Sequence, residues 1–422
     1  MATAEPDIRR DVIIVGGGFA GIAAARRLAS EGVEVLLVDR NNYHQFQPML
    51  YQLAASQVGI SQVARPLRAI FRRDRTVRVV VDEVTAVDPE AKQVTLADGA
   101  VCGARALVVA AGATANFFGI PGAQEHAYPL YTLDDAIRLS ARMLADLDRA
   151  DTLTGGERDI NVIVVGGGPT GVEIAGALAE NIDTAVAAAY SDAFARGITV
   201  RLIEMAPSVL GGFTEDSQDY AIQKLRERGV DVRLGVGVNE VRDDGVSLED
   251  GTWLDGDIVV WTGGLTSTGL LSESGLPQGK GGRVEVDADL TVPGLDGVYV
   301  LGDCAAIPDS NGGPLPQLAS VAQQSGKWAG RNIHADLTGG AREPFRYRDK
   351  GIMAMVGRGA AVAELGPARR TLHGPLAFVS WLGVHATMLS GAWQRTGAIA
   401  SWSIAFLTNR RPQVVLGQAE KS

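Results

Sequence analysis

Cysteine, histidine and aromatic residues are scarce in this chain of 422 residues. The sequence contains only two cysteines, Cys102 and Cys304, and five histidines, and aromatic side chains make up 6% of it. The two cysteines are far apart and form no C-x-x-C pair, so they exclude a disulfide scaffold and a dithiol relay, and they fit a reducing compartment. Five histidines without ligand spacing predict no metal centre.

Positive charge is also in the minority. Lys and Arg number 39 against 49 Asp and Glu, which gives a net charge of −10. An acidic surface argues against nucleic acid as a partner, because phosphate binding needs a basic face. Residues 1–11 lack a long apolar run, so we expect no signal peptide and a protein that stays on the cytoplasmic side.

Glycine, by contrast, is abundant. The chain has 52 glycines and 46% hydrophobic residues. This composition is typical of an α/β protein with many tight turns, and the length suits two or three domains.

The stretch 11–39 contains every part of a dinucleotide-binding βαβ unit. A run of β-branched residues predicts a buried strand that leads into Gly16, Gly18 and Gly21 and then into a helix. The N-terminal N–H groups of that helix would face the phosphates. A second apolar run ends at Asp39, whose carboxylate can accept hydrogen bonds from a ribose diol.

The same pattern recurs later in the chain, with Gly166, Gly168 and Gly171 at the spacing of their counterparts in the first motif. We expect the helix that follows to continue to about Phe194, and the next strand ends at Glu204. A carboxylate at this strand end favours a free 2′-hydroxyl and repels a 2′-phosphate, so NADH is preferred over NADPH. The chain therefore contains two dinucleotide folds.

The predicted fold class is α/β, with two Rossmann-like dinucleotide-binding domains and a C-terminal amphipathic helical region that attaches to a membrane. The first domain is discontinuous and comprises residues 1–115 and 265–340. The second domain comprises residues 116–264, and the membrane-attachment region comprises residues 341–422.

Several turns at the ends of predicted strands complete the two sites. One buried strand closes at Gly112, another at Gly264, and a third runs directly into Asp303. The Asp303 carboxylate is placed either to bond a sugar hydroxyl or to cap the next helix. Residues 40–52 show neither strand nor helix periodicity, so they predict a loop that holds a flat group or, alternatively, an irregular connection with buried aromatics.

The C-terminal stretch is uncharged and rich in tryptophan. Residues 374–393 and 396–408 carry no formal charge and are separated by Arg395. This pattern favours two helices lying in a membrane interface, over the alternatives of a buried core or dimer-interface helix and of a true span. Three tryptophans would anchor them: Trp381, Trp393 and Trp402. The region is locally basic, which suits anionic lipid.

Five segments together resemble the type II NADH:quinone oxidoreductases, the single-subunit respiratory NADH dehydrogenases that pump no protons. These segments are residues 38–52, 166–180, 297–309, 347–366 and the tail around 406–411. The resemblance runs over essentially the whole chain.

This resemblance implies two bound dinucleotides. The first motif, with Asp39 and Arg40, would hold the adenosine half of a tightly bound FAD, and Asp303 would meet its ribityl or pyrophosphate region. The second motif, with Glu204, would hold NADH. The segment near the isoalloxazine would be Phe46, Gln47 and Pro48, and the cofactor-binding set would also include Gly112 and Gly264.

The resemblance also implies the catalytic residues. Glu173, expected in the first turn of the second helix, matches a family glutamate that contacts the nicotinamide and has been proposed in proton transfer. The alternative is an acid favoured at a helix N-terminus. Before a later helix the family carries A-Q-x-A-x-Q, whose two amides line the quinone-head pocket. Here Ser320 replaces the first glutamine and Gln324 keeps the second, so a water or a different head group would fill the gap.

The predicted function is hydride transfer from NADH to FAD, followed by electron transfer to menaquinone or ubiquinone without proton pumping. The protein would be a peripheral homodimer on the cytoplasmic face of the cell membrane. Two alternatives stay open: an NADH-binding flavoprotein with a redox-sensing or scaffold role, and a reductase of a ferredoxin-like partner. Disulfide reductases and sulfide:quinone oxidoreductases would need the paired cysteines that the sequence lacks.

Overall fold

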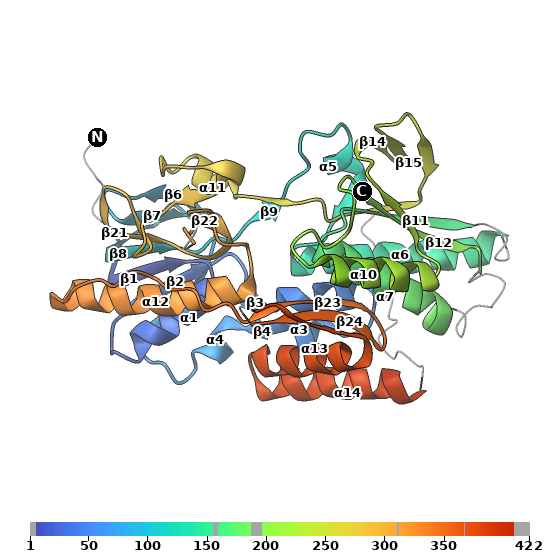
Figure 1. The fold of residues 1–422 in the computed structure, drawn as a ribbon. Coiled ribbons are helices and arrows are strands. Elements are labelled where there is room, and N and C mark those ends of the chain that lie inside the picture. Colours follow the sequence, from blue (N-terminus) through green and yellow to red (C-terminus); the bar gives the residue numbers. More distant parts are fainter. Residues whose placement is uncertain (1–5, 155–158, 187–195, 310–311, 367, 409–422) are drawn as a thin grey trace. The chain divides into compact units, whose positions relative to one another are not determined.

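The computed structural model describes residues 6–154, 159–186, 196–309, 312–366 and 368–408 (Figure 1). The chain forms two compact units. The first unit comprises Met1–His44, Arg65–Thr114 and Leu265–Arg348, and the second unit comprises Gln45–Ala64, Ala115–Gly264 and Asp349–Ser422. This division assigns residues 45–64 and the C-terminal region to the second unit. The predicted domain boundaries stay a prediction.

The first unit is built on a mainly parallel sheet with the strand order β20-β21-β8-β1-β2-β5, which β6 and β7 extend from β8 as antiparallel strands. The central strand β1 (Ile8–Val15) is buried from Val12 onward, as expected of a parallel strand that is covered on both faces. Helix α1 (Phe19–Ala29) packs closely on α12 (Ala319–Thr338). A Cβ at Gly326 would lie 2.1 Å from the Ala20 carbonyl oxygen, so this packing depends on glycine.

The remaining elements that lie wholly in the first unit are β2 (Val35–Asp39), α4 (Leu67–Ile70), β5 (Val77–Val81), β6 (Val84–Asp88), β7 (Gln93–Leu96), β8 (Val101–Val109), β18 (Leu265–Thr266), α11 (Gly269–Ser272), η3 (Lys280–Gly282), β19 (Val284–Glu285), β20 (Thr291–Val292), β21 (Leu295–Val300), η4 (Gly302–Cys304) and β22 (Ala305–Ala306). The chain passes from one unit to the other within three short strands: β3 (Tyr43–Gln45), β4 (Ala64–Pro66) and β9 (Thr114–Ala115).

The second unit repeats the doubly wound plan. Its parallel sheet has the order β10-β17-β11-β12-β13, and β14, β15 and β16 form a separate antiparallel sheet. Helix α7 (Pro169–Asn181) packs on β23 (Gly351–Gly357), the first strand of a third, antiparallel sheet. A Cβ at Gly176 would lie 2.2 Å from the Val356 carbonyl oxygen, so the helix approaches this strand at backbone distance.

The remaining elements of the second unit are η1 (Gln47–Met49), α2 (Leu50–Ala54), α3 (Ile60–Val63), α5 (Ala123–His126), β10 (Ala127–Pro129), α6 (Leu133–Thr154), β11 (Ile160–Val165), η2 (Ile182–Val186), β12 (Ile198–Glu204), α10 (Glu215–Glu227), β13 (Asp231–Leu234), β14 (Val238–Arg242), β15 (Gly245–Leu248), β16 (Trp253–Asp255), β17 (Ile258–Trp261), β24 (Ala360–Leu365), β25 (Arg370–His373), α13 (Gly374–Met388) and α14 (Ala392–Thr408).

Two expectations about local structure need revision. The loop predicted for residues 40–52 was wrong, because this segment contains the strand β3, the 3-10 turn η1 and the start of α2. Its elements are too short to show a periodicity, and Pro48 starts a helical turn rather than breaking one. The long helix after Gly171 passes into a π-helical turn, η2, at Ile182. Its expected continuation to Phe194 lies outside the described residues.

The C-terminal region forms the two predicted helices, which pack on each other in Figure 1. The uncharged stretch 374–393 is not one helix, because the helical backbone is interrupted at residues 389–391. Arg395 lies in the first turn of α14. Its guanidinium donates to the carbonyls of Thr387 and Leu389 and so caps the end of α13. Over the described part of the chain, neither these helices nor any other has the length and apolarity needed to cross a bilayer.

The expectation that Trp381 anchors the chain in an interface was wrong. Its side chain is 0% exposed, whereas Trp393 is 72% exposed. Trp402 is partly buried and donates from its indole N–H to Gln52 Oε1 at 2.9 Å. Many of the exposed side chains of α13 and α14 are nevertheless apolar: Leu376, Val379, Val384, Ile399, Ile404, Phe406 and Leu407. Thr387, Arg395, Thr396 and Ser403 of these helices are exposed as well.

Candidate functional site

The first glycine turn has a backbone that only glycine can follow. Gly16 has φ of +104°, and a Cβ on Gly21 would lie 1.9 Å from the Gly16 carbonyl oxygen. The N–H of Gly17 donates to Asp39 Oδ2 at 2.6 Å, and the N–H of Asn41 donates to Asp39 Oδ1 at 2.7 Å. The acid at the end of β2 is thereby held against the turn between β1 and α1.

Three strand ends converge at this turn. A Cβ on Gly16 would lie 2.3 Å from the Ala110 carbonyl oxygen, just after β8, and a Cβ on Gly302, just after β21, would lie 3.2 Å from Ala20 Cβ in α1. Gly112 and Asp303 follow these two strands directly. The predicted residues of the first unit are therefore gathered at one edge of its sheet, where ligands of open α/β sheets bind.

The electrostatics of this edge suit a pyrophosphate and a ribose. A Cβ on Gly18, at the start of α1, would meet no described atom within 4 Å, so the helix N-terminus is open. Burial raises the pKa of Asp39, while its bonds from Gly17 and Asn41 and the charge of the exposed Arg40 lower it. The Asp303 backbone carbonyl accepts a bond from Gln317 Nε2 at 2.9 Å.

The second glycine turn reproduces the first almost atom for atom. Gly166 has φ of +105°, and a Cβ on Gly171 would lie 1.8 Å from the Gly166 carbonyl oxygen. The N–H of Gly167 donates to Glu204 Oε2 at 2.5 Å, and the N–H of Ala206 donates to Glu204 Oε1 at 2.7 Å. Both turns therefore use their strand-end acid in the same way, although one acid is Asp and the other is Glu.

The second turn also has an open helix N-terminus. A Cβ on Gly168 would meet none of the described atoms within 4 Å. Gly264 follows the neighbouring strand β17 with φ of +158°, and its carbonyl accepts a bond from the Asn116 N–H at 3.0 Å. A side chain at Gly264 would collide with the Phe118 ring, 2.8 Å away. The second unit thus offers one complete dinucleotide cradle.

Glu173 is a buried acid of α7 and not a helix cap. It lies beyond the first turn of α7, contrary to expectation, and the described first turn carries no acid. Its side chain is 9% exposed, and Oε1 accepts a bond from the Met355 N–H of β23 at 3.1 Å. Burial raises the pKa of Glu173 to about 8, against the opposing effects of the Met355 amide and the Trp381 indole. At neutral pH the carboxyl group is mainly protonated.

Glu173 lines a cavity of about 570 Å³ within the second unit. Apolar residues of α13 and α14, such as Phe378, Leu382 and Ile399, form one wall of this cavity. Ser403 of α14 is polar, and the rest of the polar lining comes from other elements: Tyr51, Gln52, Gln57, Glu180 and Arg358. We call this space the Glu173 cavity. An apolar cavity of this size with a few convergent polar groups suits a flat organic ligand.

An aromatic cluster that the sequence did not predict lies behind this cavity. The Trp381 and His385 rings are stacked at 3.7 Å between centroids, and Phe46 meets His385 edge-on at 6.2 Å. Tyr51 meets the Trp381 ring edge-on at 6.1 Å. The available signal was the four-residue spacing of Trp381 and His385, which places them on one face of a helix.

Phe46, Gln47 and Pro48 lie in the second unit, at the start of η1. The Phe46 side chain is 2% exposed and contacts His385. The first glycine turn, by contrast, belongs to the first unit, so the structure leaves their expected meeting at a flavin as a prediction.

Ser320 and Gln324 lie one turn apart on α12, and both already have partners in the first unit. The Ser320 hydroxyl is 2.9 Å from the Tyr347 hydroxyl. The Gln324 amide donates to the Arg348 carbonyl and accepts from the Arg348 N–H, both at 3.1 Å. These bonds tie α12 to the following segment, so a ligand that used the two side chains would have to replace them.

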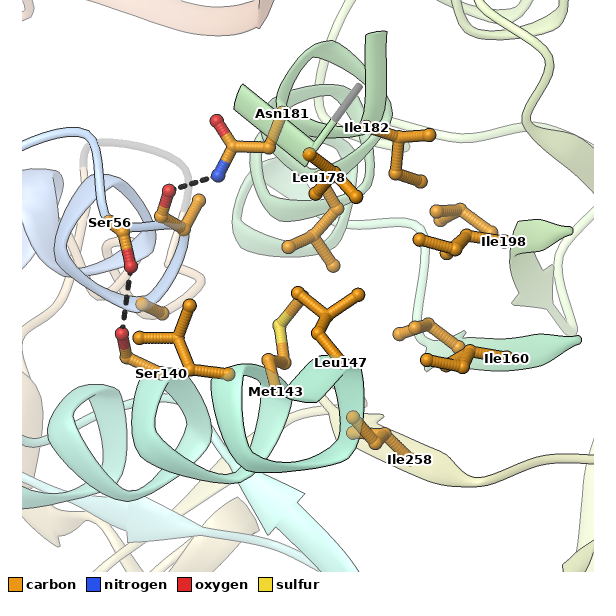
Figure 2. Close-up of a pocket in the computed structure, with 16 residues that line it drawn as sticks. Ser56, Ser140, Met143, Leu147, Ile160, Leu178, Asn181, Ile182, Ile198 and Ile258 are labelled. Atoms are coloured by element: carbon orange, nitrogen blue, oxygen red, sulfur yellow. Dashed lines mark hydrogen bonds between the residues drawn. The ribbon is translucent and has the colours of Figure 1, made fainter. Parts of the chain in front are cut away.

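A second, smaller cavity of about 50 Å³ lies beside the sheet of the second unit (Figure 2). Leu147, Ile160 and other apolar side chains surround it, and a hydrogen bond of 3.0 Å between Ser56 and Ser140 marks its polar end. Asn181 also borders it and donates to the Ala55 carbonyl. It contains none of the predicted site residues and has the lining of a packing defect.

Both cysteines of the chain are buried free thiols in the first unit. Burial raises the pKa of Cys102, and it raises that of Cys304 to about 11. Since the thiolate is the reactive form, neither residue is poised for thiol chemistry at neutral pH.

These two cradles define the class of the protein, a flavin- and nicotinamide-type oxidoreductase with two dinucleotide folds. Residues 10–326 match the family model described as Pyridine nucleotide-disulphide oxidoreductase. Type II NADH:quinone oxidoreductase Ndh of Mycobacterium tuberculosis is 34% identical over 98% of this chain and 92% of that protein. The type II NADH:quinone oxidoreductase of Staphylococcus aureus is 31% identical over 83% of this chain and 88% of that protein.

The chain belongs to the type II NADH:quinone oxidoreductase family. Its fold also matches a solved structure of NDH2 from Plasmodium falciparum in complex with NADH. That match has a TM-score of 0.88 and 21% identity, and it covers 96% of this chain and 99% of the other.

Proposed function

We propose that this protein oxidises NADH and reduces a quinone, with bound FAD between them. The observation that carries this function is the duplicated cradle: two open helix N-termini, each with a strand-end acid bonded to its glycine turn. Two complete sites in one chain suit two dinucleotides that exchange electrons. Membership of the type II NADH:quinone oxidoreductase family supports the quinone as acceptor.

The first unit would hold FAD. Gly16, Gly18 and Gly21 would cradle its pyrophosphate at the start of α1, and Asp39 would bind the adenosine ribose. Gly112, Asp303 and Arg40 would complete this site. FAD, when bound, carries two electrons from NADH to the quinone, with Phe46, Gln47 and Pro48 near its ring system.

The second unit would hold NADH through Gly166, Gly168, Gly171 and Gly264. Glu204 stands at the strand end where the adenosine ribose is read, and its carboxylate would accept hydrogen bonds from a free 2′-hydroxyl. A 2′-phosphate would bring like charge to the same point, so NADPH should bind poorly.

We propose that Ser320 and Gln324 contact the quinone head group, and that Glu173 takes part in its protonation. The apolar wall of the Glu173 cavity, formed by α13 and α14, suits an isoprenoid tail. The Glu173 carboxyl, protonated at neutral pH, would supply a proton to the reduced head group. All protons would come from the side on which the protein lies, so none would be pumped.

The exposed apolar side chains of α13 and α14 support peripheral attachment to a membrane, and the face that we propose is the cytoplasmic face of the cell membrane. Seven such residues and Trp393 are exposed on these two helices. Single exposed apolar residues are common on protein surfaces, whereas a group of this size marks an interaction surface. A homodimer is the assembly we expect, and sedimentation of the holoenzyme tests it.

A spectroscopic experiment tests the function. The purified protein should be yellow, should lose its colour with NADH faster than with NADPH, and should regain it when a menaquinone or ubiquinone analogue is added under anaerobic conditions. Bleaching by NADH without recovery on adding any quinone would overturn the quinone-reductase function and favour the redox-sensing alternative. In that case the bonds from Ser320 to Tyr347 and from Gln324 to Arg348 would be structural.

A further inference from the structure

The indole N–H of Trp381 is a buried donor that makes no well-formed hydrogen bond with the described residues, yet it is near enough to the Glu173 carboxyl to favour its charged form. The side chain is fully buried, and stacking on His385 fixes the plane of its ring. His385 Nδ1 lies 2.8 Å from the Trp381 carbonyl oxygen, and this bond holds the two residues together along α13. A buried donor without a well-formed bond is costly, so a stronger acceptor beside it would be favoured.

Glu173 is the acceptor that this indole can serve. The Met355 N–H and the Trp381 indole are the two groups that favour the charged form of its carboxyl against burial. A carboxyl group that keeps its proton is a weak acceptor, while a carboxylate forms charge-assisted bonds about twice as strong as neutral ones. The indole N–H would therefore bond more strongly to the deprotonated form of Glu173 than to the protonated form.

Other titratable groups nearby do not fill this role. Tyr51 of α2 is buried with its pKa raised well above the ordinary value, first by burial and then by the charge of Glu173, and it already accepts a bond from Gln52. Burial lowers the pKa of His385 to about 4, so this ring is neutral. On the same cavity, Glu180 accepts a bond from the Arg358 N–H at 2.9 Å.

We propose that Trp381 is a positioning residue for Glu173, and that its indole N–H bonds the carboxylate once the carboxyl proton has left. This proposal rests on the proposed function. Reduction of a quinone by NADH takes up one proton beyond the transferred hydride. The O–H bond of Glu173 breaks, the proton bonds to an oxygen of the reduced quinone, and solvent then returns a proton to the carboxylate. Trp381 stabilises the charge that exists between these two transfers.

The direct test is a pH titration of the Glu173 carboxyl by infrared difference spectroscopy on the holoenzyme, without NADH or quinone. The band is assigned by its loss in Glu173→Gln. Trp381→Phe keeps an aromatic ring that can stack on His385 but removes the N–H. In this variant the midpoint of the Glu173 titration should move to higher pH by about one unit, the size expected for the loss of one hydrogen bond to a charged group.

A matched control is Trp328→Phe in the first unit, where the indole N–H donates to the Glu343 carbonyl at 2.9 Å. It makes the same chemical change and should leave the midpoint where it is. Trp381→His restores a ring N–H and should bring the midpoint back towards the wild-type value. If Trp381→Phe does not fold, Trp381→Leu takes its place as the variant without a donor.

An unchanged or lowered midpoint in the donor-free variant would overturn the proposal. So would a Trp381→His midpoint that stays with the donor-free variant. Because the titration uses no substrate, its failure is distinct from a failure of the proposed function, which the recovery of flavin colour by quinone decides.

Discussion

We expect one side chain, Glu204, to decide between NADH and NADPH. Its carboxylate is fixed by the N–H groups of Gly167 and Ala206. Glu204→Gln keeps an oxygen acceptor for one of these bonds and removes the negative charge. We expect the preference for NADH over NADPH, measured as the ratio of kcat/KM values, to fall by about tenfold, the effect of one nearby charge at a partly solvated site.

The matched change in the other cradle is Asp39→Asn. It should weaken retention of the yellow cofactor through gel filtration and leave the nucleotide preference as in the wild type. A shift of nucleotide preference in Asp39→Asn, or none in Glu204→Gln, would contradict the assignment of the two units.

The raised pKa of Glu173 predicts that the rate of enzyme reoxidation by quinone falls at alkaline pH. Below about pH 8 the carboxyl is protonated and can donate, and above it the proton is lost. The rate at which quinone reoxidises the enzyme should therefore be level up to about pH 8 and then fall about tenfold per pH unit. Stopped-flow spectroscopy of the pre-reduced enzyme measures this rate.

Glu173→Gln should slow reoxidation by about a hundredfold and abolish the fall at alkaline pH, because the amide does not titrate. Glu180→Gln removes the next carboxylate along α7 and should keep the fall. If Glu173→Gln retained the wild-type pH profile, another group would be the proton donor.

Among the elements, the contact between α7 and β23 is the one that places Glu173. The helix approaches the strand so closely that Gly176 has no room for a methyl group, since a Cβ there would lie 2.2 Å from the Val356 carbonyl oxygen. In an ordinary helix Gly→Ala would stabilise by about 1 kcal/mol. Here the collision with the backbone should outweigh that gain, and Gly176→Ala should lower the free energy of unfolding by about 2 kcal/mol.

Urea unfolding measures this change. Gly211→Ala is the control, because a Cβ there would meet no described atom within 4 Å and its φ is ordinary. It should unfold at the wild-type urea concentration or slightly above. Equal midpoints for the two variants would show that α7 and β23 can separate without cost.

The two cradles could be predicted from the sequence because their determinants are local. Gly16, Gly21 and Asp39 fall within one βαβ unit, and strand, turn and acid follow in order along the chain. The same holds for Gly166, Gly171 and Glu204. The resemblance of the chain to the family added the assignment of each cradle to FAD or NADH. The geometry alone does not make this assignment, because the two glycine turns are alike.

The surroundings of Glu173 could not be predicted in this way. They combine α2, α7, β23 and α13, which are remote in the sequence, and α13 is apolar on nearly every side, so no periodicity indicates its buried face. Trp381 therefore looked like a surface anchor when it is a core residue. The segment 40–52 was equally uninformative because its strand and turns are each too short to show a pattern.

At the scale of the whole molecule, an acidic protein exposes an apolar surface on α13 and α14. A net charge of −10 opposes attachment to anionic lipid by charge alone. Contact with a membrane would thus depend on the apolar side chains of these helices. Deleting both helices would test this poorly, because it would also remove Trp381 and one wall of the Glu173 cavity.

Point substitutions separate the surface from the core. Leu376, Trp393 and Ile404 are 71%, 72% and 44% exposed, and none of them lines the Glu173 cavity. Replacing all three with Gln should reduce binding to vesicles of mixed neutral and anionic lipid by at least about a hundredfold, since full burial of an apolar side chain contributes about 1.5–3 kcal/mol and only the exposed part of each can be transferred to lipid. Sedimentation with the vesicles measures the bound fraction.

The control variant carries Trp253→Gln and Leu365→Gln, two exposed apolar residues of the second unit that lie outside these helices. It should bind vesicles as the wild type does. Both variants should still be bleached by NADH in solution, because the substituted residues belong to neither glycine turn and to neither strand-end acid. Equal vesicle binding by the triple variant and the wild type would mean that another surface makes the attachment, and α13 and α14 would then serve only to enclose the Glu173 cavity.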